Sequence, residues 1–194
     1  EGRELFDAVP FSFHEVNKAL QSHPKDVLNA LRRWNDADGV NARWQLSHFL
    51  SRVYPEFESP LPETLTALIN GADGDTLAFV ISLLEGFEGR ETLLPILRAI
   101  LASDAATDDI EKTVSLVFQE TGMMTGEFGA AETYQAKADS IRSWLDDASG
   151  RVRAFAEKEI RSLERRVAAE NRRAQEEIAL RRLDYGEPLT DADE

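Results

Sequence analysis

The sequence predicts an all-α protein, because apolar residues recur at intervals of three and four throughout the chain and start and stop signals bound these stretches. One such stripe consists of Leu46, Phe49, Leu50 and Val53. Alternating apolar and polar runs with hairpin signals are absent, so no sheet is expected. With 194 residues, 42% of them hydrophobic, the chain can form one substantial core or one short stack of helices.

Capping and breaking residues predict where the helices begin and end. Ser12 and Glu15 form a capping box, Tyr54-Pro55 ends one helix, and Thr107 begins another. The expected elements are a leading helix and four pairs of helices: 13–21, then 24–35 with 40–54, 62–70 with 75–86, 90–102 with 107–121, and 130–145 with 150–184. The glycine-rich segment 122–129 is interpreted as a connector, with a hinge or a binding loop as alternatives.

An internal repeat favours a stack of helix pairs over an irregular bundle. Six residues match six others that lie 110 positions later without a gap: Trp34, Asp36, Arg43, Leu46, Leu50 and Val53 correspond to Trp144, Asp146, Arg153, Ala156, Ile160 and Leu163. Three repeats of about 37 residues would fill this interval, which is close to the lengths of known helical repeats. A carboxylate in the turn can cap the next helix, and the indoles of Trp34 and Trp144 can seal the space between helices.

The second copy, from Ile141 to Ala156, resembles the HEAT-repeat pattern, in which an Asp-containing turn precedes a helix that opens with Val-Arg. The resemblance implies a short HEAT-like solenoid of about four helix pairs, with a leading helix and a long C-terminal helix. This domain is expected over 1–184, followed by an acidic, flexible tail at 185–194. The repeated residues are then structural rather than catalytic: Trp34, Asp36, Arg43, Trp144, Asp146 and Arg153.

Charge is distributed unevenly along the chain, whose formal net charge is −14. Residues 1–150 carry 12 Lys or Arg against 25 Asp or Glu, residues 151–182 carry 10 against 6, and residues 183–194 carry none against 5. An acidic body therefore bears a basic helix and an acidic tail. The body should repel phosphate backbones, so nucleic-acid binding is expected, if at all, only through the basic helix.

The residue types needed for common catalytic and metal sites are missing or badly spaced. The chain has no cysteine, and His14, His23 and His48 lack metal-ligand spacing. The loops Asp36 to Gly39 and Asp73 to Asp75 do not fit the calcium-loop register, so they are interpreted as caps and turns. We therefore expect no catalytic residue, cofactor or metal. Trp44, which lies off the apolar stripe of its helix, is expected to be buried against a neighbouring helix.

The C-terminal helix carries the best candidates for partner binding. Its outer half alternates glutamates with six arginines: Arg165, Arg166, Arg172, Arg173, Arg181 and Arg182. At about 1.5 Å per residue, 35 residues extend roughly 50 Å, so part of this helix should overhang the stack, self-associate, or contact the rest of a larger protein.

The sequence therefore predicts a non-catalytic protein–protein interaction scaffold. Because the chain begins with Glu1 and has neither a signal-peptide pattern nor an apolar run of membrane-spanning length, we expect a C-terminal module of a larger cytoplasmic protein that does not enter a membrane. Two alternatives remain open: a helical-repeat enzyme that acts on nucleic acid, as HEAT-like DNA glycosylases do, and a structural domain that oligomerises.

Overall fold

The computed structural model describes residues 14–38, 43–87, 89–120, 126 and 128–184, and these residues form helices and connections without a strand. Contacts divide the chain into two compact units, residues 1–120 (unit 1) and residues 121–194 (unit 2). The domain expected over 1–184 spans both units. The all-helical class predicted from apolar spacing is confirmed for the described residues.

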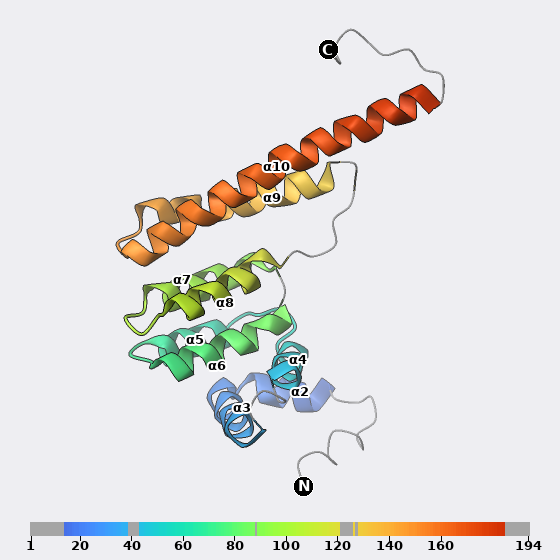
Figure 1. The fold of residues 1–194 in the computed structure, drawn as a ribbon. Helices are drawn as coiled ribbons and strands as arrows, with labels where there is room; N and C mark the ends of the chain where they lie inside the picture. The colour runs from blue at the N-terminus through green and yellow to red at the C-terminus, as the bar shows by residue number, and fades with distance from the viewer. Residues whose placement is uncertain (1–13, 39–42, 88, 121–125, 127, 185–194) are drawn as a thin grey trace. The chain divides into compact units, whose positions relative to one another are not determined.

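Unit 1 consists of consecutive helices joined by short connections (Figure 1). They are α2 (His14–Gln21), α3 (Pro24–Asp38), α4 (Arg43–Val53), α5 (Leu61–Ile69), α6 (Gly74–Leu84), α7 (Leu94–Ala102) and α8 (Asp108–Gln119), with the 3₁₀ segments η2 (Glu85–Phe87) and η3 (Glu91–Leu93). The predicted ranges differ from these bounds by a few residues. Thr107 caps α8, as predicted, by accepting a hydrogen bond from the Ile110 amide. The predicted Ser12–Glu15 capping box lies outside the described side chains.

Helices of unit 1 contact one another in an alternating order: α3 contacts α5, α5 contacts α7, α4 contacts α6, and α6 contacts α8. The central helix is α6, in which every side chain from Phe79 to Leu84 is buried. A helix that is apolar on all sides must be enclosed by other elements, and α6 packs against α4, α5 and α8. Its N-terminus is held by Asp73, whose carboxylate accepts a hydrogen bond of 2.8 Å from the Thr76 amide.

A close backbone contact fixes α4 against the end of α6. A Cβ atom placed on Gly86, in η2, would lie 2.4 Å from the carbonyl oxygen of Ser47. Only glycine therefore allows η2 to approach α4 this closely. On the same side of α4, Leu46, Leu50 and Val53 are almost completely buried.

The corner after α4 joins three parts of unit 1. The Tyr54 hydroxyl donates a hydrogen bond of 3.0 Å to the Leu20 carbonyl of α2, and Gln21 donates from Nε2 to the Val53 carbonyl at 2.6 Å. The buried ring of Phe57 meets that of Phe87 edge-on, with 4.7 Å between centroids. These contacts anchor α2 and η2 to the end of α4.

Unit 2 pairs a short helix with a long one. It contains α9 (Gly129–Ser140), the 3₁₀ segment η4 (Arg142–Asp146) and α10 (Gly150–Asp184). The apolar stripe of α10, formed by Val152, Ala156, Ile160 and Leu163, is buried, and α10 packs against α9 and η4. Figure 1 shows α10 continuing well beyond the beginning of α9.

The sequence predicts one helix over 130–145, whereas the structure has α9 followed by a separate 3₁₀ turn. The backbone changes at Ile141, which has φ −108° and ψ 5° and is fully buried. Burial of this side chain and of Trp144 requires the turn, and no glycine or proline marks it in the sequence. Most of the predicted connector at 122–129 lies outside the described residues.

Candidate functional site

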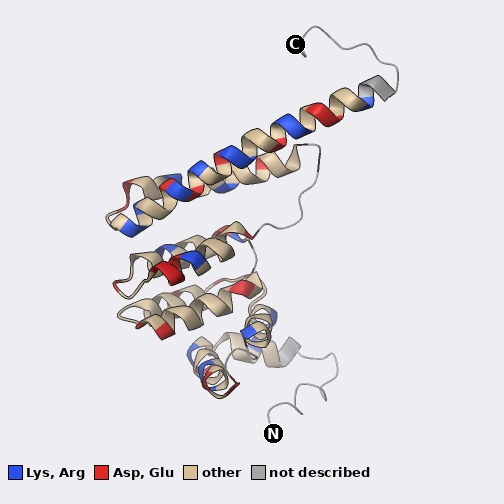
Figure 2. Cartoon of the chain, viewed as in Figure 1, with Lys and Arg blue, Asp and Glu red and all other residues tan. Residues whose placement is uncertain are grey.

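The arginines predicted to bind a partner lie on the outer half of α10. Figure 2 shows Lys and Arg at intervals along this helix. The side chains of Arg165, Arg166, Arg172, Arg173 and Arg181 are exposed, whereas that of Arg182 lies outside the described residues. The buried stripe through Leu163 and Ala174 holds the helix, so these arginines are presented by a fixed backbone over most of its length.

Helical spacing separates the arginines into more than one face. Arg165 and Arg172 are seven residues apart and share a face, while Arg166 and Arg173 share another about 100° away. Arg161, four residues before Arg165, joins the first face, which we call the arginine stripe: Arg161, Arg165 and Arg172. The sequence prediction missed Arg161, although its four-residue spacing from Arg165 is visible in the sequence.

Among the arginines on the outer half of α10 and in the arginine stripe, Arg166 and Arg161 contact other side chains of unit 2. The Arg166 guanidinium lies 5.6 Å from the centroid of the Tyr134 ring, which is cation–π geometry. Arg161 forms an ion pair of 2.9 Å with Glu157, one turn earlier on α10. Both side chains are mostly exposed, so these contacts orient the charges without removing them from solvent.

The second copy of the sequence repeat forms the turn between η4 and α10. Trp144 is buried and its ring lies 6.2 Å from that of Phe155. The turn carboxylate is Asp147, which accepts a hydrogen bond of 2.8 Å from the Ser149 amide, whereas Asp146 is exposed. The assignment of Asp146 to this role is therefore corrected to Asp147. Arg153 donates to the carbonyl of Ala148 at 3.0 Å and thereby ties α10 to the turn.

The first copy has a different local structure. Trp34 lies inside α3, only half-buried, and its Nε1 donates to Asp38 at 2.9 Å. Asp36 also lies inside α3 and pairs with Arg32 at 3.2 Å, so it does not occupy a turn. Arg43 is the exposed first residue of α4. The prediction that the two copies have the same local structure is thus wrong. The helix α3 continues to Asp38, whereas α9 ends at Ser140, before the positions that correspond to Trp34 and Asp36.

Trp44 is exposed, contrary to the prediction. Its side chain is 71% exposed and stacks on His48, with ring centroids 5.2 Å apart and planes inclined by 5°. The buried positions of α4 are Leu46, Ser47, Leu50 and Val53, and Trp44 points away from them. Its position off the apolar stripe was therefore a signal of exposure.

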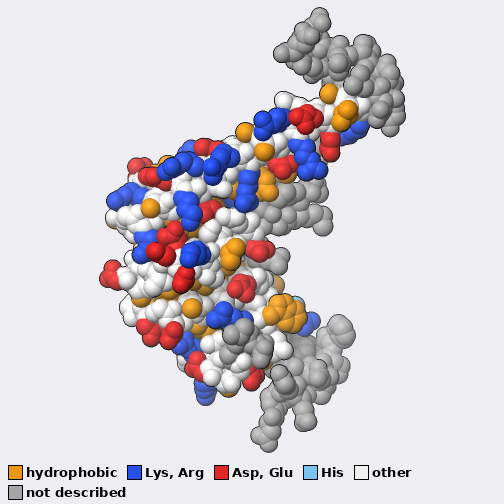
Figure 3. Space-filling model, viewed as in Figure 1, with side chains coloured by type: hydrophobic (Ala, Val, Ile, Leu, Met, Phe, Trp, Pro, Cys, Tyr) orange, Lys and Arg blue, Asp and Glu red, His pale blue; other side chains and the backbone are white. Residues whose placement is uncertain are grey.

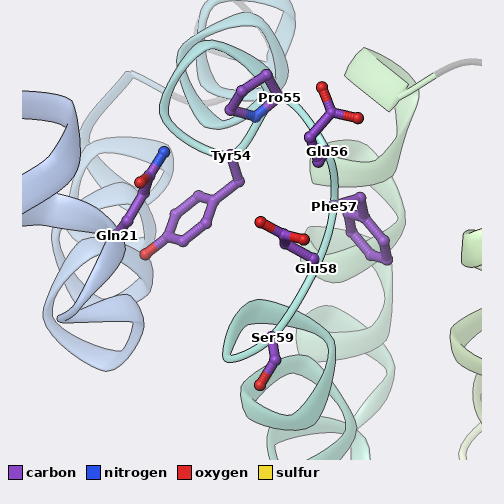
Figure 4. Close-up of a pocket in the computed structure, with 7 residues that line it drawn as sticks. All are labelled: Gln21, Tyr54, Pro55, Glu56, Phe57, Glu58 and Ser59. Atoms are coloured by element: carbon purple, nitrogen blue, oxygen red, sulfur yellow. The ribbon is translucent and has the colours of Figure 1, made fainter. Parts of the chain in front are cut away.

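The described residues of unit 1 line a small pocket and a larger groove. The small pocket lies at the corner after α4, where Figure 4 shows the Tyr54 ring directed toward the helix that carries Gln21. Its volume is about 70 Å³, room for roughly two water molecules, whereas ligand pockets occupy some 300–1,000 Å³. Burial raises the pKa of Tyr54 to about 12, so this phenol remains a neutral hydrogen-bond donor.

A larger open groove runs between α3 and α5. It has a volume of about 350 Å³ and is lined by Lys25, Leu28, Asn29, Arg32, Thr64, Ala67, Leu68 and Thr76. Arg32 is held in it by Asp36 and by the Phe79 ring, whose centroid is 5.2 Å away. The lining of this groove can contact a ligand, but it does not combine a nucleophile with a carboxylate or histidine that could act as its general base.

Carboxylates with lowered pKa values serve as caps and ion pairs at the surface. The hydrogen bond from Thr76 lowers the pKa of Asp73, that from Lys112 lowers the pKa of Asp109, and that from Arg142 lowers the pKa of Asp139. The interpretation of the Asp73 loop as a helix cap is confirmed. Within the described residues, no group of three or more His, Asp or Glu is arranged to hold a metal ion.

Within the described residues, no helix is both long enough and apolar enough to cross a membrane. Comparisons with protein-family models, with curated proteins and with solved structures each yield no match. The function is therefore argued from the sequence and geometry of the chain.

Proposed function

We propose that this chain is a non-catalytic interaction module of a larger cytosolic protein, in which a short HEAT-like solenoid presents α10 to a protein partner. The observation that carries the proposal is the exposed set of arginines on a helix that extends beyond its packing partner.

The alternating contacts of unit 1 support the solenoid part of the proposal. In a solenoid each helix pair packs on the next, so first helices contact first helices and second helices contact second helices. The contacts from α3 to α5 to α7, and from α4 to α6 to α8, follow this order. Solenoids of this kind expose long faces that suit protein partners, although the fold alone does not select one function.

The arginine stripe supports the partner-binding part. Arg161, Arg165 and Arg172 are exposed along one side of α10, and Figure 3 shows Lys and Arg side chains gathered over this helix with fewer carboxylates among them. Arginine is enriched at protein interfaces because its planar guanidinium forms paired hydrogen bonds with carboxylates. The stripe therefore favours an acidic partner surface.

Charge reversal tests this role. The full chain and its Arg165→Glu/Arg172→Glu variant are used to capture proteins from an extract of the native cells. The control variant, Lys25→Glu/Arg33→Glu, reverses the same number of positive charges on α3. We expect proteins that bind the wild type and the control but not the stripe variant. Equal capture by all three chains would refute the role of the stripe.

Self-association through α10 is a second candidate, favoured by the order of charges beyond the apolar stripe. Arg172 and Arg173 are followed by Glu176 and Glu177, and all four are exposed. Within one helix this order, with arginine on the N-terminal side, is the less favourable one. In two antiparallel α10 helices related by a twofold axis near Ala174, the arginines of one copy would face the glutamates of the other.

A charge swap separates this candidate from binding to a different protein. Reversing Arg172 and Arg173 to glutamate should dissociate a dimer, and reversing Glu176 and Glu177 to arginine in the same chain should restore it. Light scattering coupled to size-exclusion chromatography measures the molar mass. A wild-type chain that remains monomeric at high concentration would exclude this candidate.

A further inference from the structure

One side of α4 carries a row of exposed side chains that the fold does not use. Trp44, His48 and Arg52 are spaced by four residues, so they lie along the same side of the helix. All three are exposed, and Trp44 is the most exposed of the large hydrophobic side chains in the described chain. Figure 3 shows hydrophobic and histidine side chains together at the surface over α4.

The backbone beneath this row is fixed. Leu46 and Leu50, on the opposite side of α4, are fully buried, and Gly86 lies against the Ser47 carbonyl. At the far end of the row, Asn17 of α2 donates a hydrogen bond of 3.2 Å to the Arg52 carbonyl. The stacking of Trp44 on His48 orients the indole before any ligand arrives, which reduces the entropy lost on binding.

The row offers hydrogen-bond donors and an aromatic surface. The indole of Trp44 and the guanidinium of Arg52 can only donate, and within the described chain neither has a hydrogen-bond or ion-pair partner. No aspartate or glutamate occurs on α4, although unit 1 as a whole is acidic. Such a row complements carboxylates that flank an apolar side chain.

We propose that the α4 row, Trp44, His48 and Arg52, binds a short acidic peptide segment of a partner protein, with an apolar side chain of that segment packed on Trp44. This inference rests on the proposed function, since it specifies the class of partner that the interaction module receives at a second surface. Tryptophan and arginine are the residues that most often dominate binding energy at interfaces.

A peptide fits the row better than a nucleic acid does. Residues 1–120 contain 10 Lys or Arg against 20 Asp or Glu, so unit 1 has a formal net charge of −10. A nucleic-acid strand carries a phosphate on every nucleotide and would extend from the row over this acidic surface. A short peptide can place its few carboxylates on Arg52 and His48 alone.

The test uses the full chain and an array of synthetic peptides of about twelve residues. The number of Asp and Glu residues and the presence of one Leu or Phe are varied independently, and binding of selected peptides is then measured by fluorescence anisotropy. Peptides with both features should bind best. Trp44→Ala and Arg52→Ala should each weaken binding by at least about tenfold, because each removes a central contact.

Leu116→Ala is the matched control, because Leu116 of α8 is 68% exposed and lies outside the row. It should leave peptide affinity unchanged, and thermal melts should confirm that all variants fold. Binding that ignores acidic content, or that survives Trp44→Ala, would overturn the proposal. If a labelled oligothymidylate binds and its binding depends on Trp44, the ligand of the α4 row is a nucleic acid and not a peptide.

The outcome is distinguishable from failure of the proposed function. If captured proteins are lost on reversal of the arginine stripe but retained by Trp44→Ala, the interaction module stands and the α4 row has no part in it.

Discussion

At the scale of single residues, the close contact between Gly86 and the backbone of α4 constrains the packing of unit 1. The Cβ position at Gly86 lies 2.4 Å from the Ser47 carbonyl oxygen and 2.8 Å from its carbon, both of which belong to the backbone of a packed helix. Neither atom can rotate away, as the end of a long side chain could. An added methyl group must therefore separate η2 from α4, and Phe87, next in the chain, is buried in the same region.

Gly86→Ala should lower the free energy of unfolding by roughly 1–3 kcal/mol, the usual effect of overpacking, as measured by chemical denaturation. Gly74→Ala is the control, because a Cβ there would be 4.0 Å from its nearest neighbour, the Ala105 carbonyl oxygen. A Gly86→Ala chain as stable as the control would show that η2 can shift without loss.

The three tryptophans differ in environment: Trp144 is buried, Trp34 is half-buried, and Trp44 is exposed. Truncating Trp144 leaves a cavity beside Phe155, so Trp144→Ala should destabilise the chain by about 3–5 kcal/mol. Trp44→Ala removes the same side chain from the surface and should change stability by less than about 0.5 kcal/mol. Thermal melts of the two variants compare them directly, and equal melting temperatures would contradict the burial of Trp144.

At the scale of secondary-structure elements, the helices were predictable because each has local causes. Asp73 and Thr107 cap α6 and α8, and apolar residues at spacings of three and four form the buried stripes. The break between α9 and η4 has no local cause, since it depends on burying Ile141 and Trp144. Nor could the sequence tell which of the adjacent Asp146 and Asp147 would occupy the turn.

Thr107 tests the contribution of one cap. Its hydroxyl accepts from the Ile110 amide at 3.3 Å, so Thr107→Ala should destabilise the chain by about 1 kcal/mol. Thr107→Ser keeps the hydroxyl and should retain most of the stability. If denaturation curves of the two variants coincide, the hydrogen bond does not hold the start of α8.

At the scale of the whole molecule, the candidate site was only partly predictable. The arginines of α10 were identified from the sequence, and their division into faces, which also brings in Arg161, follows from their spacing in the continuous helix that was expected over 150–184. The α4 row was missed because a lone tryptophan is usually core. The position of Trp44 off the apolar stripe was a signal of exposure, but whether a neighbouring element covers that side of α4 depends on how unit 1 packs.

The outer end of α10 should be separable from the fold. The buried stripe of α10 reaches Ala174, and no described side chain after Ala174 is buried. Leu180 is 62% exposed, and an isolated helical segment of this length is marginal in water.

Deleting residues 175–194 should therefore leave the melting temperature within a few degrees of the wild type, while abolishing any self-association that uses Glu176 and Glu177. Deleting residues 160–194 removes Ile160 and Leu163 from the buried stripe and should lower the melting temperature far more. Circular dichroism and light scattering on both chains measure the two effects separately. A large loss of melting temperature in the shorter deletion, with no change in molar mass or partner binding, would mean that the end of α10 folds as a cap of its own chain. An unchanged melting temperature with lost association identifies it as a binding element, because its contacts then lie outside the chain that carries it.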